Sequence, residues 1–581
     1  MSKSNIYLQV IYSIIFIVLI NSIGSFVYFR LDLTAEKRHT LSIATEKILT
    51  DLDDIIYIKV YLDGDFPAGF KRLQNQSRET LENFKNIAGK RLDFEFINPS
   101  ASSSEEERKA VYTQLLEQGL QPTDLQVKEQ AGMSSSIIFP GAIIYYKQQH
   151  TAVQLLKNEI GVLPEVALNN SIETLEYELI TAISKLTRDK KQKIAFLKGH
   201  GELNEDEVAD ISYSVLSDSY SLSEYYEVEH FDISEFEIDS VNNKPDLVRQ
   251  LQRLNTYKTI IIAKPQSAFN NIDKLLLDQY LMSGGNLFFL IDGISANMDS
   301  LNRSDGYFMA KKKQLNLDDF LFKYGARVNA DLVQDKRAAQ IPIITGYSAN
   351  MPQQSFFAWP YYPLLFSDKK KHAISNSLDA IKCEFVSSID TIKNHIKKTI
   401  LLHSSANSRI VPSPHRVSLG ILQNPPDATS FNNPNRAVAV LLEGEFESIF
   451  KNRIIPKNSG FDFKESGEEA KIILVGDGDI IQNDVSNKTG NIYPLGYDRF
   501  AEFIYPGNKT FIMNAVHYLC GNNQELLLSP LKTKQLKLRL LDKQKINNYK
   551  IYIQLLNVIL PILLIIFFGI IYGFSRKRKY A

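Results

Sequence analysis

The stretch Asn286–Ile291, NLFFLI, decides the fold class of this chain together with three short runs of the same kind. Those runs are Lys193–Leu197 (KIAFL), Thr259–Ala263 (TIIIA) and Lys471–Val475 (KIILV). After its first residue each run is continuously apolar, whereas a strand with one face in water alternates apolar and polar residues. The sequence therefore predicts a mostly parallel sheet covered on both faces, inside a larger α/β domain over residues 191–528.

A smaller α/β domain is predicted upstream, over residues 31–165. It begins with a short helix that Thr40 or Ser42 caps and that ends near Leu52. The elements that follow are a strand at Ile55–Leu62, a helix at Phe66–Ala88, a strand at Leu92–Ile97, a helix at Ser104–Gln118, and strands at Leu125–Val127 and Ile137–Tyr146. Thioredoxin-like topology is one option for this order. An amphipathic helix at Ser171–Leu186, within residues 166–190, is expected to link the two domains.

Apolar segments lie at both ends of the chain. Ile6–Phe29 and Ile551–Phe574 are each long enough to cross a bilayer as a helix, which takes about 20 residues. We expect an N-terminal anchor within residues 1–30, with a cleaved signal peptide as the alternative, because Ser22-Ile23-Gly24 is a possible cleavage site. In the second segment Pro561 is tolerable within a membrane, and a basic tail over residues 575–581 ends the span. Two α/β domains flanked by N- and C-terminal transmembrane helices are the predicted architecture.

Charge does not decide the orientation in the membrane. The tails carry five basic residues, and the first and last twenty residues of the central body carry eleven, which would keep the body in the cytosol. Long loops translocate largely regardless of charge, so the orientation stays open. The basic juxtamembrane segment, residues 529–550, could lie on anionic lipid headgroups or form a solvated stalk.

Composition excludes several classes of function. The 581 residues include 66 basic and 66 acidic side chains, which gives no attraction to nucleic acid, so no nucleic-acid partner is predicted. Cys383 and Cys520 cannot form a disulfide framework, a cysteine metal site or a C-x-x-C redox motif. They leave the redox compartment undecided, and no cofactor is predicted.

Polar residues follow the predicted parallel strands where ligands bind in open α/β sheets. His200, Glu202, Asp292, Asp477 and Asp479 are therefore the candidate ligand-binding residues, suited to a hard cation or a small polar ligand. The alternative is that these residues only make turns and cap helices. Whether a metal binds is left open.

No enzyme signature is present in the sequence. The chain lacks G-x-x-x-x-G-K-[ST] and G-x-S-x-G, and both cysteines read as structural thiols. We therefore predict a protein that is not an enzyme. The alternative is a membrane-tethered hydrolase or amidotransferase-like enzyme that uses His200, Glu202, Asp477 and Asp479, and a third option is an envelope scaffold.

Ser355–Phe366, SFFAWPYYPLLF, holds the single tryptophan of the chain. Pro360 and Pro363 argue against a helix or a central strand, so the stretch is predicted to be a fixed aromatic loop. Trp359, Tyr361 and Tyr362 are the candidate partner-binding residues. Packing between domains is the alternative.

The order of several motifs resembles the GldG family, the auxiliary, substrate-binding-like component of an ABC transporter associated with gliding motility. The similar segments are Arg30–Lys37 with Thr40-Leu41-Ser42, Lys198-Gly199-His200-Gly201-Glu202, Ser283-Gly284-Gly285-Asn286, Trp359-Pro360-Tyr361-Tyr362-Pro363, Gly476-Asp477-Gly478-Asp479 and Pro494–Phe500. The resemblance covers essentially the whole chain.

This resemblance implies a protein of the bacterial inner membrane with a periplasmic body. It implies a separate permease subunit and a separate P-loop ATPase subunit as partners. It also implies that the larger domain has a glutamine-amidotransferase-like fold, shared with an intraflagellar-transport protein, without the amidotransferase nucleophile. No catalytic residue is carried over from the family.

Overall fold

The computed structural model describes residues 12, 15–16, 41–102, 104–129, 132–157, 163–188, 191–216, 220–238, 245–303, 306–348, 351–366, 372–376, 378–453, 462–486, 488–522, 526, 528 and 543–580. They belong to two units, Met1–Thr533 and Lys534–Ala581, which are described separately below. Most of the predicted anchor Ile6–Phe29 and most of the basic segment 529–550 lie outside the described residues.

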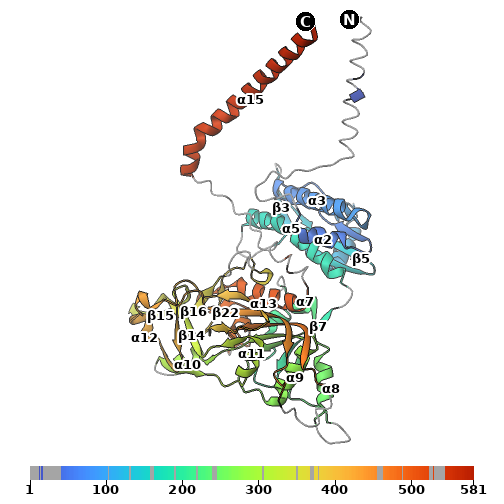
Figure 1. Ribbon diagram of the computed structural model, residues 1–581. Coiled ribbons are helices and arrows are strands. Elements are labelled where there is room, and N and C mark those ends of the chain that lie inside the picture. The colour runs from blue at the N-terminus through green and yellow to red at the C-terminus, as the bar shows by residue number, and fades with distance from the viewer. Residues whose placement is uncertain are drawn as a thin grey trace. The chain divides into compact units, whose positions relative to one another are not determined.

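The first α/β region, in which Figure 1 labels α2, α3, α5, β3 and β5, is built on a four-stranded sheet of order β2-β1-β5-β6. Its elements are α2 (Ile43–Thr50), β1 (Ile56–Val60), α3 (Ala68–Ala88), β2 (Leu92–Phe96), α4 (Glu105–Glu117), β3 (Thr123–Glu129), β4 (Gly132–Ile138), β5 (Gly141–Tyr146), β6 (Gln149–Gln154) and α5 (Pro164–Leu186). Strands β1 and β2 are parallel, while β5 and β6 run antiparallel to their neighbours. The Ser42 hydroxyl accepts the Thr45 N–H and caps α2, as the sequence predicts.

One strand prediction in this region is wrong. The expected strand Ile137–Tyr146 is two strands, because β4 pairs with β3 in a separate hairpin and β5 joins the main sheet. Pro140 lies at the break and has no N–H for a ladder. Its carbonyl accepts the N–H groups of Leu155 and Leu156, which fixes the turn between the two sheets.

The second α/β region contains a seven-stranded sheet of order β19-β22-β23-β10-β9-β7-β8. Its strands are β7 (Gln192–Lys198), β8 (Tyr226–Asp232), β9 (Thr259–Ala263), β10 (Asn286–Leu290), β19 (Lys397–His403), β22 (Ala437–Glu447) and β23 (Ser466–Val475). The four apolar runs of the sequence are β7, β9, β10 and β23, and they are mutually parallel neighbours. The prediction of a mostly parallel sheet is confirmed, with β22 and β19 added antiparallel at one edge.

Helices cover both faces of this sheet, which explains its continuous hydrophobicity. They are α6 (Ala209–Ser212), α7 (Leu222–Tyr225), α8 (Leu247–Leu254), α9 (Asn271–Met282), α11 (Asp318–Tyr324) and α13 (Pro506–Leu519). Along β9, Ile260 and Ile262 belong to the core that contains α8, α9 and α11, whereas Ile261 belongs to the core that contains α13.

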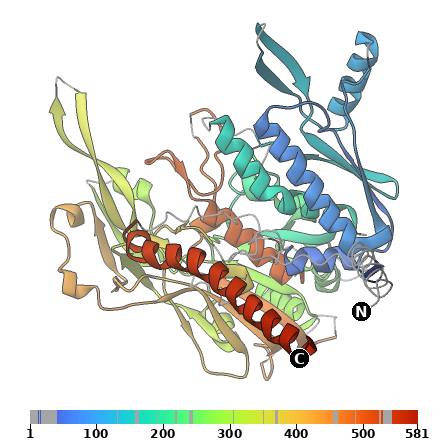
Figure 2. The same ribbon diagram turned by 90° about the horizontal axis from the view of Figure 1, so that it is seen from above.

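Further strands that the sequence analysis does not identify, together with two helices, make up most of the rest of this region. They are β11 (Ile294–Ser295), β12 (Tyr307–Lys312), β13 (Ala326–Val328), β14 (Asp331–Asp335), β15 (Ala338–Ser348), β16 (Met351–Leu365), β17 (Ile381–Lys382), β18 (Ile389–Thr391), β20 (Ser408–Pro412), β21 (His415–Ser418), β24 (Tyr497–Asp498) and β25 (Phe503–Ile504), with helices α10 (Met298–Arg303) and α12 (Gly420–Gln423). The β15–β16 hairpin is the long yellow-green ribbon that projects from the region in Figure 2.

The aromatic stretch is part of strand β16, so the prediction of a loop is wrong. Strand β16 lies between β15 and β17. Its register with β15 shifts between Ala338 and Gln340, which face Pro363 and Ala358. Pro360 lies inside this irregularity, where no regular ladder needs its missing N–H.

The three aromatic residues proposed to bind a partner have almost no exposed surface. Trp359 is 0% exposed, and Tyr361 and Tyr362 are each 1% exposed, in a core cluster with Ile341 and Phe385. A side chain without exposed surface cannot contact a partner in this conformation. The sequence-based docking role is therefore corrected to a packing role, within this core rather than between domains.

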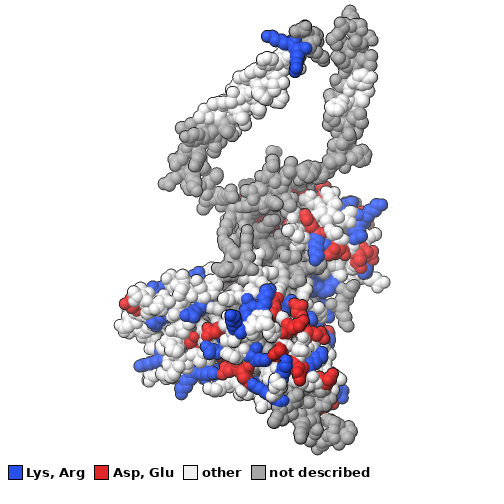
Figure 3. All heavy atoms as spheres, viewed as in Figure 1, with Lys and Arg blue, Asp and Glu red and all other residues white. Residues whose placement is uncertain are grey.

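The second unit contains helix α15 (Lys543–Tyr580), which continues through Pro561. Its portion Asn557–Arg578 has a mean hydropathy of 2.6 and is long and apolar enough to cross a membrane. On the face that Figure 3 shows, this apolar portion carries no charged side chain until the basic residues near the C-terminus.

Candidate functional site

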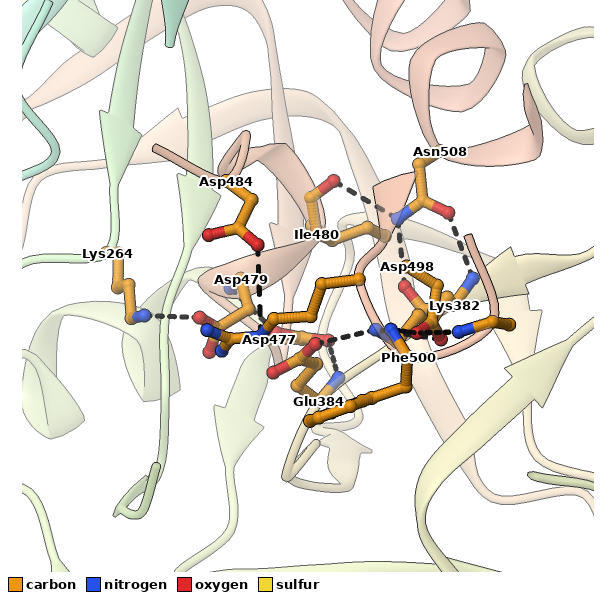
Figure 4. Close-up of polar contacts among 12 residues, drawn as sticks. Lys264, Lys382, Glu384, Asp477, Asp479, Ile480, Asp484, Asp498, Phe500 and Asn508 are labelled. Atoms are coloured by element: carbon orange, nitrogen blue, oxygen red, sulfur yellow. Dashed lines mark hydrogen bonds and ion pairs between the residues drawn. The ribbon is translucent and has the colours of Figure 1, made fainter. Parts of the chain in front are cut away.

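Three aspartates that follow parallel strands meet at one edge of the large sheet, and Figure 4 shows two of them, Asp477 and Asp479. Asp292 lies just after β10, and Asp477 and Asp479 follow β23. One carboxylate oxygen from each lies within 4.8 Å of the others. Neighbouring parallel strands end at the same edge, and the residues that follow them therefore converge.

Two glycines let the chain come this close. A Cβ on Gly476 would collide with the backbone carbonyl of Ser387, whose N–H donates to the Gly476 carbonyl at 2.8 Å. A Cβ on Gly478 would lie 2.7 Å from the Lys264 Cβ and 2.9 Å from Asp292 Oδ1. The alternation Gly-Asp-Gly-Asp is thus needed for backbone approach as well as for turning.

Replacing Gly476 by alanine is expected to destabilise the protein by about 3 kcal/mol, because a backbone carbonyl cannot move aside as a flexible side chain can. Gly420→Ala is the matched control, since its Cβ would meet only the Ser418 hydroxyl, at 3.4 Å. Urea unfolding of the full chain in detergent measures both. Equal stability of the two variants would contradict the close approach.

Hydrogen bonds and ion pairs already occupy the three carboxylates. Asp479 pairs with Lys264, whose ammonium also donates to Gln482 at 2.8 Å. Asp292 accepts the Gly478 N–H at 2.6 Å and pairs with Lys313 at 3.1 Å.

Asp477 accepts the N–H groups of Asp479 and Glu384, at 2.7 and 2.9 Å. The donor set suits a hard cation in chemistry. A cation bound by all three carboxylates would nevertheless have to compete with two lysine ammonium groups for them.

Burial and mutual repulsion shift the protonation of this cluster. Burial raises the pKa of the Asp477 carboxyl well above its usual range, and the neighbouring Asp479 and Asp292 add to the effect. Burial also raises the pKa of Asp479, to about 6, although Lys264 opposes the shift. For Lys264 the attraction of Asp479 and Asp292 outweighs burial, and its pKa is raised. Asp477 and Asp479 therefore hold their protons to a higher pH than isolated aspartates do.

A second ionic cluster adjoins the first and is built from residues distant in sequence. The Lys382 ammonium lies 2.9 Å from Glu384 Oε1 and 3.2 Å from Asp498 Oδ2. Asp498 is fully buried and also accepts the Phe500 N–H at 2.9 Å. The Asn508 side chain exchanges two hydrogen bonds with the backbone of Lys382 and fixes its position (Figure 4).

His200 and Glu202 do not join the three aspartates. They form a separate group with Asp273. His200 Nε2 lies 2.9 Å from Asp273 Oδ2, and Nδ1 lies 3.4 Å from Glu202 Oε1. The imidazole stacks on Phe269 with ring centroids 3.7 Å apart. Burial opposes the charge on His200, but hydrogen bonds to Asp273 and Glu202 outweigh it and raise the pKa to about 9. This buried triad ties the exit of β7 to the start of α9.

Asp273 is a residue that the sequence analysis does not select. It closes a capping box with Asn270 at the first turn of α9. The spacing Asn-x-x-Asp before an apolar helix is the signal that could have identified it.

A cavity of about 350 Å³ opens beside the aspartate cluster. Lys264, Glu384, Asp479 and Gln482 line it from the sheet edge. The sequence analysis does not select the other residues that matter here, which are Glu207, Asp299, Asp484, Tyr497 and Arg499. Tyr497 and Arg499 belong to the segment Pro494–Phe500, but no motif links them to the other three, so only the fold brings the five together.

The cysteines do not form a reactive site. Cys383 and Cys520 are buried free thiols. Burial raises the pKa of Cys383 well above its usual range and that of Cys520 to about 11. Both are therefore protonated at neutral pH and unsuited to nucleophilic attack.

Comparison with known proteins gives relatives in sequence. An uncharacterized protein of Borreliella burgdorferi is 22% identical over 585 residues, which cover 98% of this chain and 97% of the relative. A domain of unknown function, DUF7088, matches residues 35–145.

Solved structures give only faint likenesses. The mmIFT52 N-terminal domain is 14% identical and covers 56% of this chain and 97% of its own, with a TM-score of 0.30. Gan42B, a GH42 beta-galactosidase, is 8% identical and covers 76% of this chain and 40% of its own, with a TM-score of 0.21. Neither likeness supports an inference.

The model of the family described as ABC-type uncharacterized transport system matches residues 191–515. These residues contain the seven-stranded sheet and the whole aspartate cluster. More than half of the chain is covered by this match. The chain therefore belongs to the family of auxiliary components of ABC-type uncharacterized transport systems.

Proposed function

We propose that this chain is a non-enzymatic, membrane-anchored auxiliary subunit of an ABC transporter that works with a separate permease and a separate P-loop ATPase. The family match over residues 191–515 carries the proposal. The sequence has no P-loop motif, so another subunit would have to supply ATP hydrolysis. The apolar portion of α15 supports anchoring.

The finer proposal is a GldG-like role in gliding motility or envelope secretion, at the bacterial inner membrane with a periplasmic body. The ordered motifs between Arg30 and Phe500 support it. A thioredoxin-like fold is proposed for residues 31–165, and the sheet order β2-β1-β5-β6 with one parallel pair supports this fold. An amidotransferase-like fold without its nucleophile is proposed for residues 191–528, with residues 166–190 as the linking helix.

Affinity purification of the tagged full chain at native level, in mild detergent, tests the role. We expect mass spectrometry to recover a polytopic permease and a P-loop ATPase in a fixed ratio. The matched control carries Ile565→Lys and Phe568→Lys, at side chains of α15 that are 72% and 67% exposed. Each lysine costs about 3 kcal/mol at the centre of a bilayer, so recovery of the permease should fall with this control.

Two results would count against the proposal. Recovery of neither transporter subunit with the unaltered chain would contradict the transporter role. Recovery of envelope proteins alone would favour a scaffold without a transport function.

A further inference from the structure

The cavity beside the aspartate cluster has the size and position of a ligand site. Its volume of about 350 Å³ falls within the range of small-molecule pockets. It opens at the carboxyl ends of parallel strands β9 and β23, where open α/β sheets bind ligands. The size and position of the cavity do not identify the class of ligand, whereas the charges of the residues that line it do.

Carboxylates outnumber cations in the cavity lining. The three cations are Lys264, Lys382 and Arg499, and the five carboxylates are Glu207, Asp299, Glu384, Asp479 and Asp484. Each cation already has a carboxylate partner: Lys264 pairs with Asp479, Lys382 with Glu384, and Arg499 lies 3.8 Å from Asp484. Glu207 and Asp299 remain without a cationic partner among the described residues.

The wall behind the cavity adds negative charge. Asp498 is fully buried and shares Lys382 with Glu384, so two carboxylates compete for one ammonium. A hollow lined with surplus carboxylates attracts cations and repels anions. Phosphates, nucleotides and free carboxylic acids are therefore poor ligands for it.

An aromatic surface distinguishes an organic cation from a metal ion. Tyr497 lines the cavity and stacks on Tyr493, with ring centroids 4.6 Å apart and an angle of 6° between the rings. A ring face attracts an ammonium or guanidinium group by cation–π interaction. A divalent metal ion is not coordinated by an aromatic ring face and binds oxygen ligands such as carboxylates instead.

We infer that this cavity binds a small organic cation that carries a primary amine or guanidinium group. Its N–H groups would donate to Glu207 and Asp299, and its charge would lie near the Tyr497 ring. The inference goes beyond the proposed transporter role, and it concerns the chain itself without partner subunits. Binding to the purified chain and co-purification of transporter subunits can therefore fail independently.

Isothermal titration of the purified full chain in detergent, at low ionic strength and pH 7.5, tests the inference. The probes are spermidine and arginine as cations, glutamate and inorganic phosphate as anions, and Ca²⁺ as a metal. We expect saturable binding of at least one organic cation and none of either anion. Raising the salt concentration to 0.5 M should weaken that binding, because it is electrostatic.

Variants separate the cavity from unspecific surface charge. The double variant Glu207→Gln, Asp299→Asn should weaken binding at least tenfold. Asp93→Asn is the matched control, because it removes an exposed carboxylate from the first α/β region, and it should leave Kd unchanged. Tyr497→Phe keeps the ring and should keep the affinity, whereas Tyr497→Leu should lose about fivefold.

Three outcomes would overturn the inference. They are no saturable binding of either cation, equal loss of affinity in the Asp93→Asn control, and tighter binding of Ca²⁺ than of both organic cations. The last would instead assign the cavity to a metal. Unfolding temperatures of all variants show whether a loss of affinity reflects a loss of fold.

Discussion

Replacing Lys382 by methionine is expected to lower the free energy of unfolding by about 3 to 5 kcal/mol, the range seen when one partner of a buried ion pair is removed. The Lys382 side chain is 8% exposed, and its ammonium is the cation nearest to Asp498, which has no exposed surface. Burial lowers the pKa of Lys382, but Glu384 and Asp498 outweigh burial and raise it, so the charge is present in the fold. Methionine keeps an unbranched side chain that is one atom shorter, and it removes the ammonium group with its charge.

Urea unfolding of the full chain in detergent measures this loss, and Trp359 reports it because it is the single tryptophan and is fully buried. The control is the double variant Lys382→Met, Asp498→Asn, which removes the charge stranded on the fully buried Asp498 and leaves only that of the less buried Glu384. We expect it to recover more than half of the lost stability, since a buried pair replaced as a whole costs little. A loss below 1 kcal/mol in the single variant would show that Asp498 does not depend on Lys382.

His200→Gln is expected to destabilise the protein by about 3 kcal/mol at pH 6 and by much less above pH 9. The pKa of His200 rises from 6.5 to about 9 in the fold, and each pKa unit corresponds to about 1.4 kcal/mol. A raised pKa stabilises the fold fully below the unfolded value of 6.5. That contribution is lost as the pH rises through 9, because the folded imidazole then also gives up its proton.

Unfolding curves at pH 6, 8 and 10 check this dependence against the unaltered chain. Asp273→Asn should also destabilise the protein more at pH 6 than at pH 10, because it weakens the interaction that most raises the pKa of His200. His150→Gln is the matched control at an exposed histidine and should be neutral at every pH. A pH-independent loss in His200→Gln would mean that packing on Phe269, rather than charge, sets its role.

The sequence predicts the parallel core well because local pattern and burial agree there. After their first residues, Thr259 and Asn286, TIIIA and NLFFLI are entirely apolar. They become β9 and β10, which are buried along their whole length. Once parallel neighbours are assumed, the convergence of Asp292 and Asp477 follows from geometry alone. Local chemistry also identifies the Ser42 cap, because a hydroxyl just before a helix can accept a hydrogen bond from a backbone N–H of the first turn, here that of Thr45.

The aromatic strand shows where local rules fail. Pro360 argues against a strand in isolation, and the fold accepts it at a register shift where the ladder has no bond for it to break. The residues next to Trp359 in the sequence do not indicate whether its ring is buried or exposed. Its position inside a core depends on Ile341 and Phe385, which approach it only in the folded chain.

The apolar C-terminal span, the parallel sheet and the aspartates at its edge can be predicted from the sequence, because each depends on residues close together in the chain or on a period that local burial imposes. In contrast, long-range folding brings Lys382 and Asp498 to this edge and pairs His200 with Asp273. It also placed Asp299 and Tyr497 around one cavity. These contacts join residues tens to hundreds of positions apart, and no local pattern records which of many charged side chains the fold will place together.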